Sequence, residues 1–400
     1  MSNSEKAPLT PETTQEKKPI HIALDNKLYD LTHFAEVHPG GREILEDFHE
    51  TDASQAFYAI HSKDAAKMLD KLKHRELPPN ERLPKRPYLD FVNELEAKGL
   101  FKPNYFIEAL LIGHTLLLFA IAIILNEERP FLSACFLGIA TLTAGWVGHH
   151  LDHSRDSKLR DIGNWFSPIT LGFSLGWWSE KHNRHHVSCN ETEKDGDIQL
   201  MPFLWLWTPK KTEDNWNRRF QHVYFGILYM ILHYKWQFDS VVFALKHKRK
   251  FEIKLLAVHF LLYVIFFKAR VVFLGILISG TLSAFVVTAS HQSEEKIYSK
   301  RELVKGSQSH YEINDYALQQ LVTTRNITTP HWLLNYLCGG MQFQIEHHLF
   351  PRMPLYRLSE VRPYVQDYCE RHNIRYKEEG FWEMMVRNYK TIHTFAALEL

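Results

Sequence analysis

The chain has 400 residues and a formal net charge of +1, which gives it no general attraction to nucleic acid, and we expect no nucleic-acid partner. Twenty-six phenylalanines, seventeen tyrosines and ten tryptophans accompany long apolar runs, whereas a mean hydropathy of -0.28 requires a large polar part; together they indicate a membrane protein with cytosolic mass. The four cysteines have no CxxC spacing, so the sequence indicates neither a disulfide framework nor a zinc knuckle.

The N-terminal part of the chain divides into three segments. Residues 1–19 are rich in Glu, Lys, Thr and Pro, so we expect a disordered lead that stays in the cytosol without a cleavable signal peptide. A globular pattern follows at residues 20–76. Residues 77–87 contain four prolines and four charged side chains, which is typical of a stiff, solvated linker. A second domain is therefore expected at residues 88–400.

Two histidines of the small domain have the setting of haem ligands. His38 precedes Pro39 and the glycine pair Gly40 and Gly41, and His61 follows in an Ala- and Phe-rich helical stretch. One histidine on each of two loops can hold a haem iron from both faces, which leaves no open position and favours electron transfer. The glycines let the backbone approach the macrocycle because they lack a Cβ atom.

Four apolar segments are expected to be transmembrane helices. They are residues 105–125, 131–148, 255–267 and 271–288. Short connections join the first to the second and the third to the fourth, so the segments form two hairpins. Basic residues are more numerous outside these short connections, which places both termini and the histidine clusters described below in the cytosol.

Two further apolar stretches, residues 165–178 and 220–232, are shorter and interrupted by polar groups. We expect interfacial or buried helices there, because a span at either place would put the histidine clusters described next on opposite sides of the membrane. Residues 355–376 have the pattern of a cytosolic helical segment that closes over the last of these clusters.

Three histidine clusters lie beside apolar runs. They are His149 and His153; His182, His185 and His186; and His347 and His348, with Gln344 shortly before the last pair. Residues three and four apart share one face of a helix, so each cluster aims its imidazoles in one direction, and seven convergent imidazoles can hold more than one metal ion. Imidazole binds iron, zinc, copper and nickel alike. A neighbouring electron-transfer domain favours a redox-active metal, because zinc has no redox chemistry.

Longer matches identify both parts of the chain. Residues 20–76, with NKLYDLTHF, HPGG and HSKDAAKML, resemble a cytochrome b5 domain, which implies haem b held by His38 and His61. The remainder resembles the membrane fatty acid desaturases, and among them the front-end desaturases that carry an N-terminal cytochrome b5 domain. The motifs are HHLDH at 149–153, HNRHH at 182–186 and QIEHH at 344–348, in which glutamine replaces the first histidine of the third box.

The resemblance implies a fold and a metal centre. The fold is an α-helical multi-pass membrane domain, with four transmembrane helices in two hairpins plus cytosolic helices, behind an N-terminal α+β cytochrome b5-like haem domain. The centre would hold two non-haem iron ions. Its ligands would be His149, His153, His182, His185, His186, His347 and His348, with His291 as an additional family ligand. Gln344 would ligate a metal, contact it through water or orient a neighbour.

The implied activity is the formation of a cis double bond in a fatty acyl chain, with O₂ as oxidant and electrons relayed from the haem. The new bond would lie between the carboxyl end and an existing double bond, as in delta-5 and delta-6 enzymes of polyunsaturated fatty acid synthesis. Implied partners are an acyl-CoA or phospholipid-linked substrate and NADH-cytochrome b5 reductase, in the endoplasmic reticulum membrane. The alternatives are a sphingolipid long-chain-base desaturase, a lipid hydroxylase fused to cytochrome b5, and an electron carrier whose histidine clusters are structural or hold zinc.

The first box departs from the usual family pattern, HDxGH. His150 stands where Asp is common, and Asp152 stands where Gly is common. Ligating imidazoles normally donate their second N–H to a carboxylate or carbonyl, and four acids are candidates for this task. They are Asp152, Asp195, Asp197 and Glu346. The alternative is that these acids form a solvated face.

Overall fold

The computed structural model describes residues 18–83, 86–299, 302–303 and 315–398, so most of the expected disordered lead lies outside the described residues. The described chain forms two compact units. One unit takes in residues up to 54 together with 67–83, and the other takes in residues 55–66 together with those from 84 onward.

The first unit is built on a three-stranded antiparallel sheet. Its strands, in spatial order, are β1 (His21–Leu24), β2 (Lys27–Asp30) and β3 (His74–Glu76). Asp25 and Asn26 join β1 to β2 in a two-residue turn, and their φ angles of 49° and 64° match the twist of a tight hairpin. The short helices of this unit are η1 (Phe34–Glu36), α1 (Arg42–Asp47) and η2 (Pro79–Glu81). Residues 55–66, which belong to the second unit, include most of α2 (Ser54–Ile60) and the first half of α3 (Lys63–Leu69).

The second unit is predominantly helical. Its helices are α4 (Pro87–Ala97), α5 (Tyr105–Leu125), α6 (Pro130–His153), α7 (Ser157–Leu171), α8 (Leu175–Val187), η3 (Trp216–Phe220), α9 (Gln221–Met230), α10 (Leu232–Lys246), α11 (Lys250–Phe266), α12 (Ala269–Gln292), α13 (Tyr316–Thr323), α14 (Trp332–Cys338), α15 (Gln344–Leu349), η4 (Leu355–Arg357), α16 (Leu358–Arg371) and α17 (Phe381–Ala397). Two small sheets accompany them. They are β4 (Ile297–Ser299) antiparallel to β5 (Glu302–Leu303), and β6 (Asn326–Thr328) parallel to β7 (Glu378–Gly380).

Three helices among the described residues are long and apolar enough to cross a membrane, namely α5, α6 and α12. They contain the expected spans 105–125, 131–148 and 271–288. The remaining expected span, 255–267, lies almost wholly in α11, whose 17 residues begin with a charged turn. At 1.5 Å per residue α11 extends about 26 Å, which is shorter than a hydrocarbon core of about 30 Å. Length and composition therefore support three spans.

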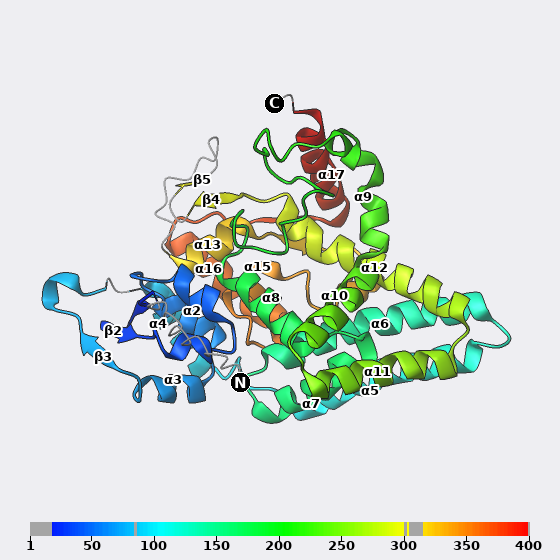
Figure 1. Ribbon diagram of the computed structural model, residues 1–400, viewed down its shortest axis with the longest axis horizontal. Coiled ribbons are helices and arrows are strands. Elements are labelled where there is room, and N and C mark those ends of the chain that lie inside the picture. Colours follow the sequence, from blue (N-terminus) through cyan, green and yellow to red (C-terminus); the bar gives the residue numbers. More distant parts are fainter. Residues whose placement is uncertain (1–17, 84–85, 300–301, 304–314, 399–400) are drawn as a thin grey trace, which may run out of the picture. The chain divides into compact units, whose positions relative to one another are not determined.

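Helix α6 lies between α5 and α12 and packs against both (Figure 1). Glycines mark its crossing with α12: a Cβ at Gly138 would lie 2.6 Å from Cγ2 of Ile278, and one at Gly275 would lie 3.0 Å from the side chain of Leu137. Small residues at a crossing let two helix backbones approach closely. Both helices run from a short connection toward a histidine-bearing end, so the packing brings these two ends together.

The stretch 165–178 is divided between α7 and α8. Gly172 ends α7 with a φ angle of +71°, and a Cβ there would lie 2.7 Å from the ring of His259, so both conformation and close approach require glycine. The stretch 220–232 likewise covers α9 and the first residue of α10. Neither α7 nor α9 has the length of a span, as expected from the sequence. Helix α16, within 355–376, packs against α15.

Candidate metal centre

The histidine clusters lie on four helices whose ends converge. Helix α6 supplies His149 and His153 from its last two turns, α8 supplies His182, His185 and His186, α12 supplies His291, and α15 supplies His347 and His348. Ser174 begins α8 by accepting a hydrogen bond from the backbone N–H of Trp177, and this start sets the direction in which the HNRHH segment faces.

Five of the histidines form one group, which we call the five-histidine set. Its members are His149, His153, His182, His186 and His347, and one ring nitrogen of each lies within 4.8 Å of those of all the others. The Nε2 atoms of His149 and His182 are 2.7 Å apart, and those of His186 and His182 are 3.1 Å apart. Ring nitrogens from α6, α8 and α15 thus converge on one small volume.

A second group, which we call the mixed set, adjoins the first. Its members are His185, Cys189, His291 and His348, again with one donor atom of each within 4.8 Å of the others. The ring centroids of His186 and His348 are 4.5 Å apart, so the two sets are neighbours. The structure therefore brings together all seven box histidines and His291, and divides them between two groups.

Cys189 is a site residue that the sequence motifs do not predict. It belongs to no CxxC pair, and sequence patterns for metal-binding cysteines depend on such pairs. Its position three residues after the second box is the only signal in the sequence, and α8 ends at Val187, so the helical spacing of the box histidines does not extend to Cys189.

The donor atoms fit bound cations. Across the described residues, Nδ1 of His149, Nε2 of His153 and both ring nitrogens of His347 are buried with no hydrogen-bond partner. Buried polar atoms without partners cost free energy, and a native structure normally satisfies them. A metal ion coordinated by one nitrogen of each ring would satisfy that nitrogen. The sets are thus suited to metal ions by both donor type and arrangement.

The protonation state of the imidazoles also suits metal binding. Burial lowers the pKa of four histidines on α8 and α15 well below the usual value, and neighbouring imidazoles lower it further. This holds for His182, His186, His347 and His348. Their rings are therefore neutral at physiological pH, as a metal ligand must be.

Two hydrogen bonds orient imidazoles of the mixed set. Both carboxylate oxygens of Asp195 accept from Nδ1 of His185, at 2.9 and 3.0 Å, and Oε1 of Gln320 accepts from Nδ1 of His348 at 2.9 Å. With Nδ1 as the donor, Nε2 carries the lone pair that can bind a metal. Asp195 is one of the four expected acids, whereas no sequence motif pointed to Gln320.

The other three expected acids have different partners. Oδ2 of Asp197 lies 3.5 Å from Nδ1 of His185, and the Asp197 carboxylate forms an ion pair with Lys181. Asp152 lies 3.5 Å from the hydroxyl of Ser167. Glu346 is fully buried and accepts hydrogen bonds from Asn326 and Tyr376, at 2.7 and 2.6 Å. The expectation of a histidine partner is therefore wrong for Glu346, and so is the alternative of a solvated face.

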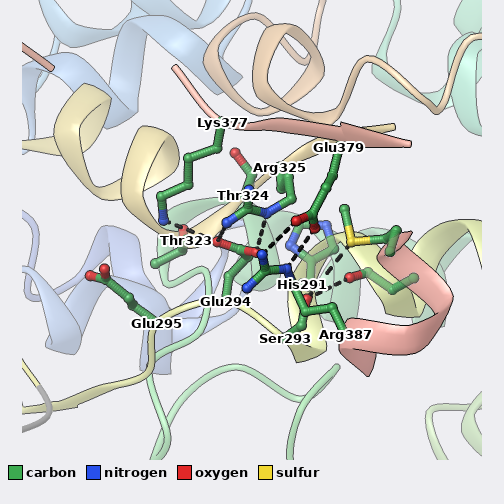
Figure 2. Close-up of polar contacts among 12 residues, drawn as sticks. His291, Ser293, Glu294, Glu295, Thr323, Thr324, Arg325, Lys377, Glu379 and Arg387 are labelled. Carbon is green, nitrogen blue, oxygen red and sulfur yellow. Dashed lines mark hydrogen bonds and ion pairs between the residues drawn. The ribbon is translucent and has the colours of Figure 1, made fainter. Parts of the chain in front are cut away.

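An ion network follows His291 at the end of α12. Glu294 accepts from Arg325 at 2.6 Å and from Lys377 at 3.0 Å, and Lys377 also donates to the carbonyl of Val322. Figure 2 shows the Glu294 carboxylate between these two cations, close to His291. Burial alone would raise the pKa of Glu294, but Lys377 and Arg325 lower it below the usual value. The network anchors the chain just beyond His291 to the segments that precede β6 and β7.

A cavity of about 570 Å³ borders both sets. Histidines of the five-histidine set and the mixed set line it, together with Gln344. Most of the remaining wall is apolar, with Trp146, Phe173 and Trp178 among its residues. Its volume and lining are typical of a binding site for a small or extended apolar ligand. Gln344 is buried, and its Oε1 has no hydrogen-bond partner in the described part of the chain.

The two expected haem ligands are each held by a backbone carbonyl. Nδ1 of His38 lies 3.1 Å from the carbonyl oxygen of Gly41, and Nδ1 of His61 lies 3.2 Å from that of Phe57. Because a carbonyl only accepts, each Nδ1 is the donor and each Nε2 carries the lone pair. A Cβ at Gly40 would lie 3.0 Å from the ring of His38, so glycine allows the close approach.

Comparison with known proteins identifies the larger part of the chain. A family model described as Fatty acid desaturase matches residues 129–380, more than half of the chain, and this range contains both the five-histidine set and the mixed set. The chain belongs to the fatty acid desaturase family. A second model, described as Cytochrome b5-like Heme/Steroid binding domain, matches residues 10–78 of this desaturase.

The desaturase is similar to other proteins over nearly its whole length. It is 28% identical to a Delta(6)-fatty-acid desaturase of Caenorhabditis elegans, over 94% of this chain and 96% of the relative. It is 28% identical to an Acyl-lipid 8-desaturase of Rebecca salina, over 94% and 92%. It is also 28% identical to a Delta(5) fatty acid desaturase of C. elegans, over 96% and 97%. The desaturase is therefore an oxidoreductase with an N-terminal cytochrome b5 domain.

Proposed function

We propose that this desaturase introduces a cis double bond into a polyunsaturated fatty acyl chain, between the carboxyl end and an existing double bond. The observation that carries this proposal is the adjacency of two metal-binding sets beside one apolar cavity. The position of the new bond is supported by the names of the relatives, which are delta-5, delta-6 and 8-desaturases, and by Gln344 at the start of the third box.

Each of the two sets would hold one non-haem iron ion. Bound iron supplies the dioxygen-dependent oxidation of unactivated C–H bonds. The chain's own residues orient and protect the site: Asp195 and Gln320 fix the rings of His185 and His348, and burial excludes water from the donor atoms. Gln344 lines the cavity next to the third box, where it can contact either a ligand or a metal-bound group.

His38 and His61 would hold haem b in the cytochrome b5 domain. The hydrogen bond from each Nδ1 to a carbonyl leaves Nε2 as the ligating nitrogen, and two histidine ligands suit a haem that only transfers electrons. The haem held by these residues would supply one-electron transfer chemistry, and the proposed electron donor to this domain is an NADH-dependent cytochrome b5 reductase.

The cavity would take the acyl chain. Burying one methylene group in an apolar wall contributes about 0.8 kcal/mol, so a long chain gains affinity along its whole length. Partly exposed charged residues also line the cavity and mark the side on which it meets water. They are Lys181, Asp197, Lys235 and Asp239. A polar acyl carrier, either CoA or a phospholipid, would lie there.

The membrane arrangement is part of the proposal. We infer two hairpins, with α5 and α6 forming the first and α11 and α12 the second, although α11 alone is shorter than a typical span. The connections within the hairpins are short, and α6 and α12 pack together and end beside the two sets. The catalytic face and both termini would lie in the cytosol, and the reticulum membrane is the proposed location.

Expression in a host that makes no polyunsaturated fatty acids tests the activity. We expect mass spectrometry to find one new double bond on the carboxyl side of an existing one when the host is fed polyunsaturated fatty acids. A hydroxylated product would instead identify a lipid hydroxylase, and a modified sphingoid base would identify a long-chain-base desaturase. Recovery of unmodified lipid from cells that contain folded, haem-bearing and iron-bearing protein would contradict the proposal.

Two variants distinguish the effect of losing the metal centre from the effect of losing the haem. His185→Ala should abolish the product and leave the haem spectrum intact. His38→Ala should remove the haem signal and most of the product, unless the host supplies a separate cytochrome b5. His33→Ala is the matched control for the haem domain, because His33 is exposed.

A further inference from the structure

The two sets differ in the number of imidazoles that they contain. The five-histidine set offers five ring nitrogens, whereas the mixed set offers three and is completed by the sulfur of Cys189. Donor atoms bound at about 2.0–2.3 Å to one ion are at most about 4.6 Å apart. All four donors of the mixed set lie within 4.8 Å of one another, whereas four donors around one tetrahedral ion are about 3.3–3.8 Å apart, so the widest pair must close by roughly 1 Å to share an ion.

The position of Cys189 is fixed from several sides. Sγ of Cys189 lies 3.6 Å from Nδ1 of His291, and the side chain of Gln319 donates to the Cys189 carbonyl at 3.3 Å. The next residue, Asn190, has a φ angle of +58° and donates from its side chain to the carbonyls of His291 and Thr323. These contacts tie the segment after α8 to the ends of α12 and α13, with the thiol facing the histidines.

Charge gives a second reason for a thiolate at this place. Metal ions held only by neutral imidazoles would leave uncompensated positive charge in a buried site, and buried charge without compensation is costly. Asp195 contacts His185 and contributes one negative charge from outside the ring of ligands. A Cys189 thiolate would contribute another by direct contact with the ion.

We propose that Cys189 is a ligand of the metal ion in the mixed set, together with His185, His291 and His348. This inference rests on the proposed function, because it assumes that the two sets hold metal ions. Binding replaces the S–H bond with a sulfur–metal bond and releases one proton to solvent, so no electrons are transferred. Burial raises the pKa of the thiol well above its usual value when no cation is present, and a coordinated thiol is deprotonated outright.

Cobalt(II) loading of the full-length protein tests this ligand without interference from the haem iron. We would purify the haem-containing chain in detergent, replace its non-haem iron with cobalt, and record X-ray absorption at the cobalt edge. The expected result is two cobalt ions per haem and, for each such pair of ions, one sulfur scatterer bound to one of them at about 2.3 Å. A thiolate-to-cobalt charge-transfer band should accompany it.

The variant Cys189→Ser should lose the sulfur scatterer and the charge-transfer band. It should also bind one of its two cobalt ions at least about 10-fold more weakly, while the other stays unchanged. Cys338→Ser is the matched control, because Cys338 is also buried but belongs to neither set. It should keep the wild-type spectrum.

The wild-type measurement decides the question by itself, so poor folding of Cys189→Ser does not leave it open. Two bound cobalt ions with only nitrogen and oxygen neighbours would overturn the thiolate ligand and leave the proposed metal centre standing. Failure of the haem-loaded protein to bind cobalt at all would overturn both proposals.

Discussion

Both carboxylate oxygens of Glu108 lie within hydrogen-bonding distance of Nε2 of His150, at 3.0 and 2.9 Å. His150 occupies the position of the first box at which this chain departs from the family pattern, and it directly follows His149. The hydroxyl of Tyr356 donates to the same carboxylate at 3.0 Å. The unusual histidine therefore has a buried partner in α5, and the pair ties α5 to the end of α6 that carries the five-histidine set.

The pair predicts a coupled effect on stability. Glu108→Leu should lower the free energy of unfolding by about 1–3 kcal/mol, because it leaves buried Nε2 of His150 without its acceptor. Adding His150→Leu should recover part of the loss, since both polar partners are then replaced. Thermal unfolding in detergent, followed by circular dichroism, measures both variants.

His114→Leu is the control for this pair, because His114 is also on α5 but is exposed. We expect it to change stability by less than Glu108→Leu. If the effects of Glu108→Leu and His150→Leu on the free energy of unfolding were strictly additive in the double variant, this would contradict the coupling.

The hydrogen bond between Asp195 and His185 predicts a loss of metal affinity. Asp195→Asn should weaken metal binding about 10- to 100-fold, because the carboxylate that orients the imidazole becomes a poorer acceptor. Non-haem iron per haem, measured after dialysis against a graded chelator, reports this affinity. Asp367→Asn makes the same change at an exposed carboxylate and should retain its iron. Equal iron retention by the two variants would exclude the orienting role.

Gly145 predicts a change in chain-length preference. It lines the cavity, and a Cβ built there meets no atom within 4 Å, so a larger side chain would enter the cavity. Gly145→Leu should disfavour longer acyl chains by about fourfold for each methylene group that it excludes. Products from fatty acids of different lengths, fed together to one host, measure the preference.

Gly113→Leu is the matched control for the cavity. A Cβ at Gly113 also meets open space, but Gly113 does not line the cavity. The variant Gly113→Leu should keep the wild-type preference for acyl chain length. A parallel shift in both variants would show that helix packing, rather than the cavity, sets chain length.

The lowered pKa values of four histidines on α8 and α15 predict acid sensitivity. Below about pH 6.5 the unfolded chain takes up protons on these rings, whereas the folded chain keeps them neutral. The free energy of unfolding should therefore fall as the pH falls below about 6.5. The histidines concerned are His182, His186, His347 and His348.

Thermal midpoints of metal-depleted protein between about pH 8 and about pH 5 measure this dependence. His182→Gln removes one titrating ring and should flatten the slope. A midpoint that rises on acidification would contradict the buried, neutral histidines.

Much of the fold follows from local patterns. The apolar run at 105–125 coincides with α5, and the runs at 131–148 and 271–288 lie inside α6 and α12. The runs end before the helices do, because the histidine-bearing final turns are polar and belong to no apolar run. Residues 165–178 look continuous in sequence but contain a break at Gly172, which the close approach of His259 from α11 requires.

Local spacing also determines that the histidines can act together. Residues three and four apart share a helix face whatever the helix packs against, so the sequence by itself indicates the donor clusters and, with the haem motif, favours a redox metal over zinc. Only the tertiary structure decides which donors meet. His185 and His186 are neighbours in sequence yet belong to different sets, as do His347 and His348. Consecutive residues point about 100° apart around a helix, so each ring joins whatever helix lies in its own direction. The same holds for Cys189 and Gln320, whose roles depend on chain segments that are distant in sequence.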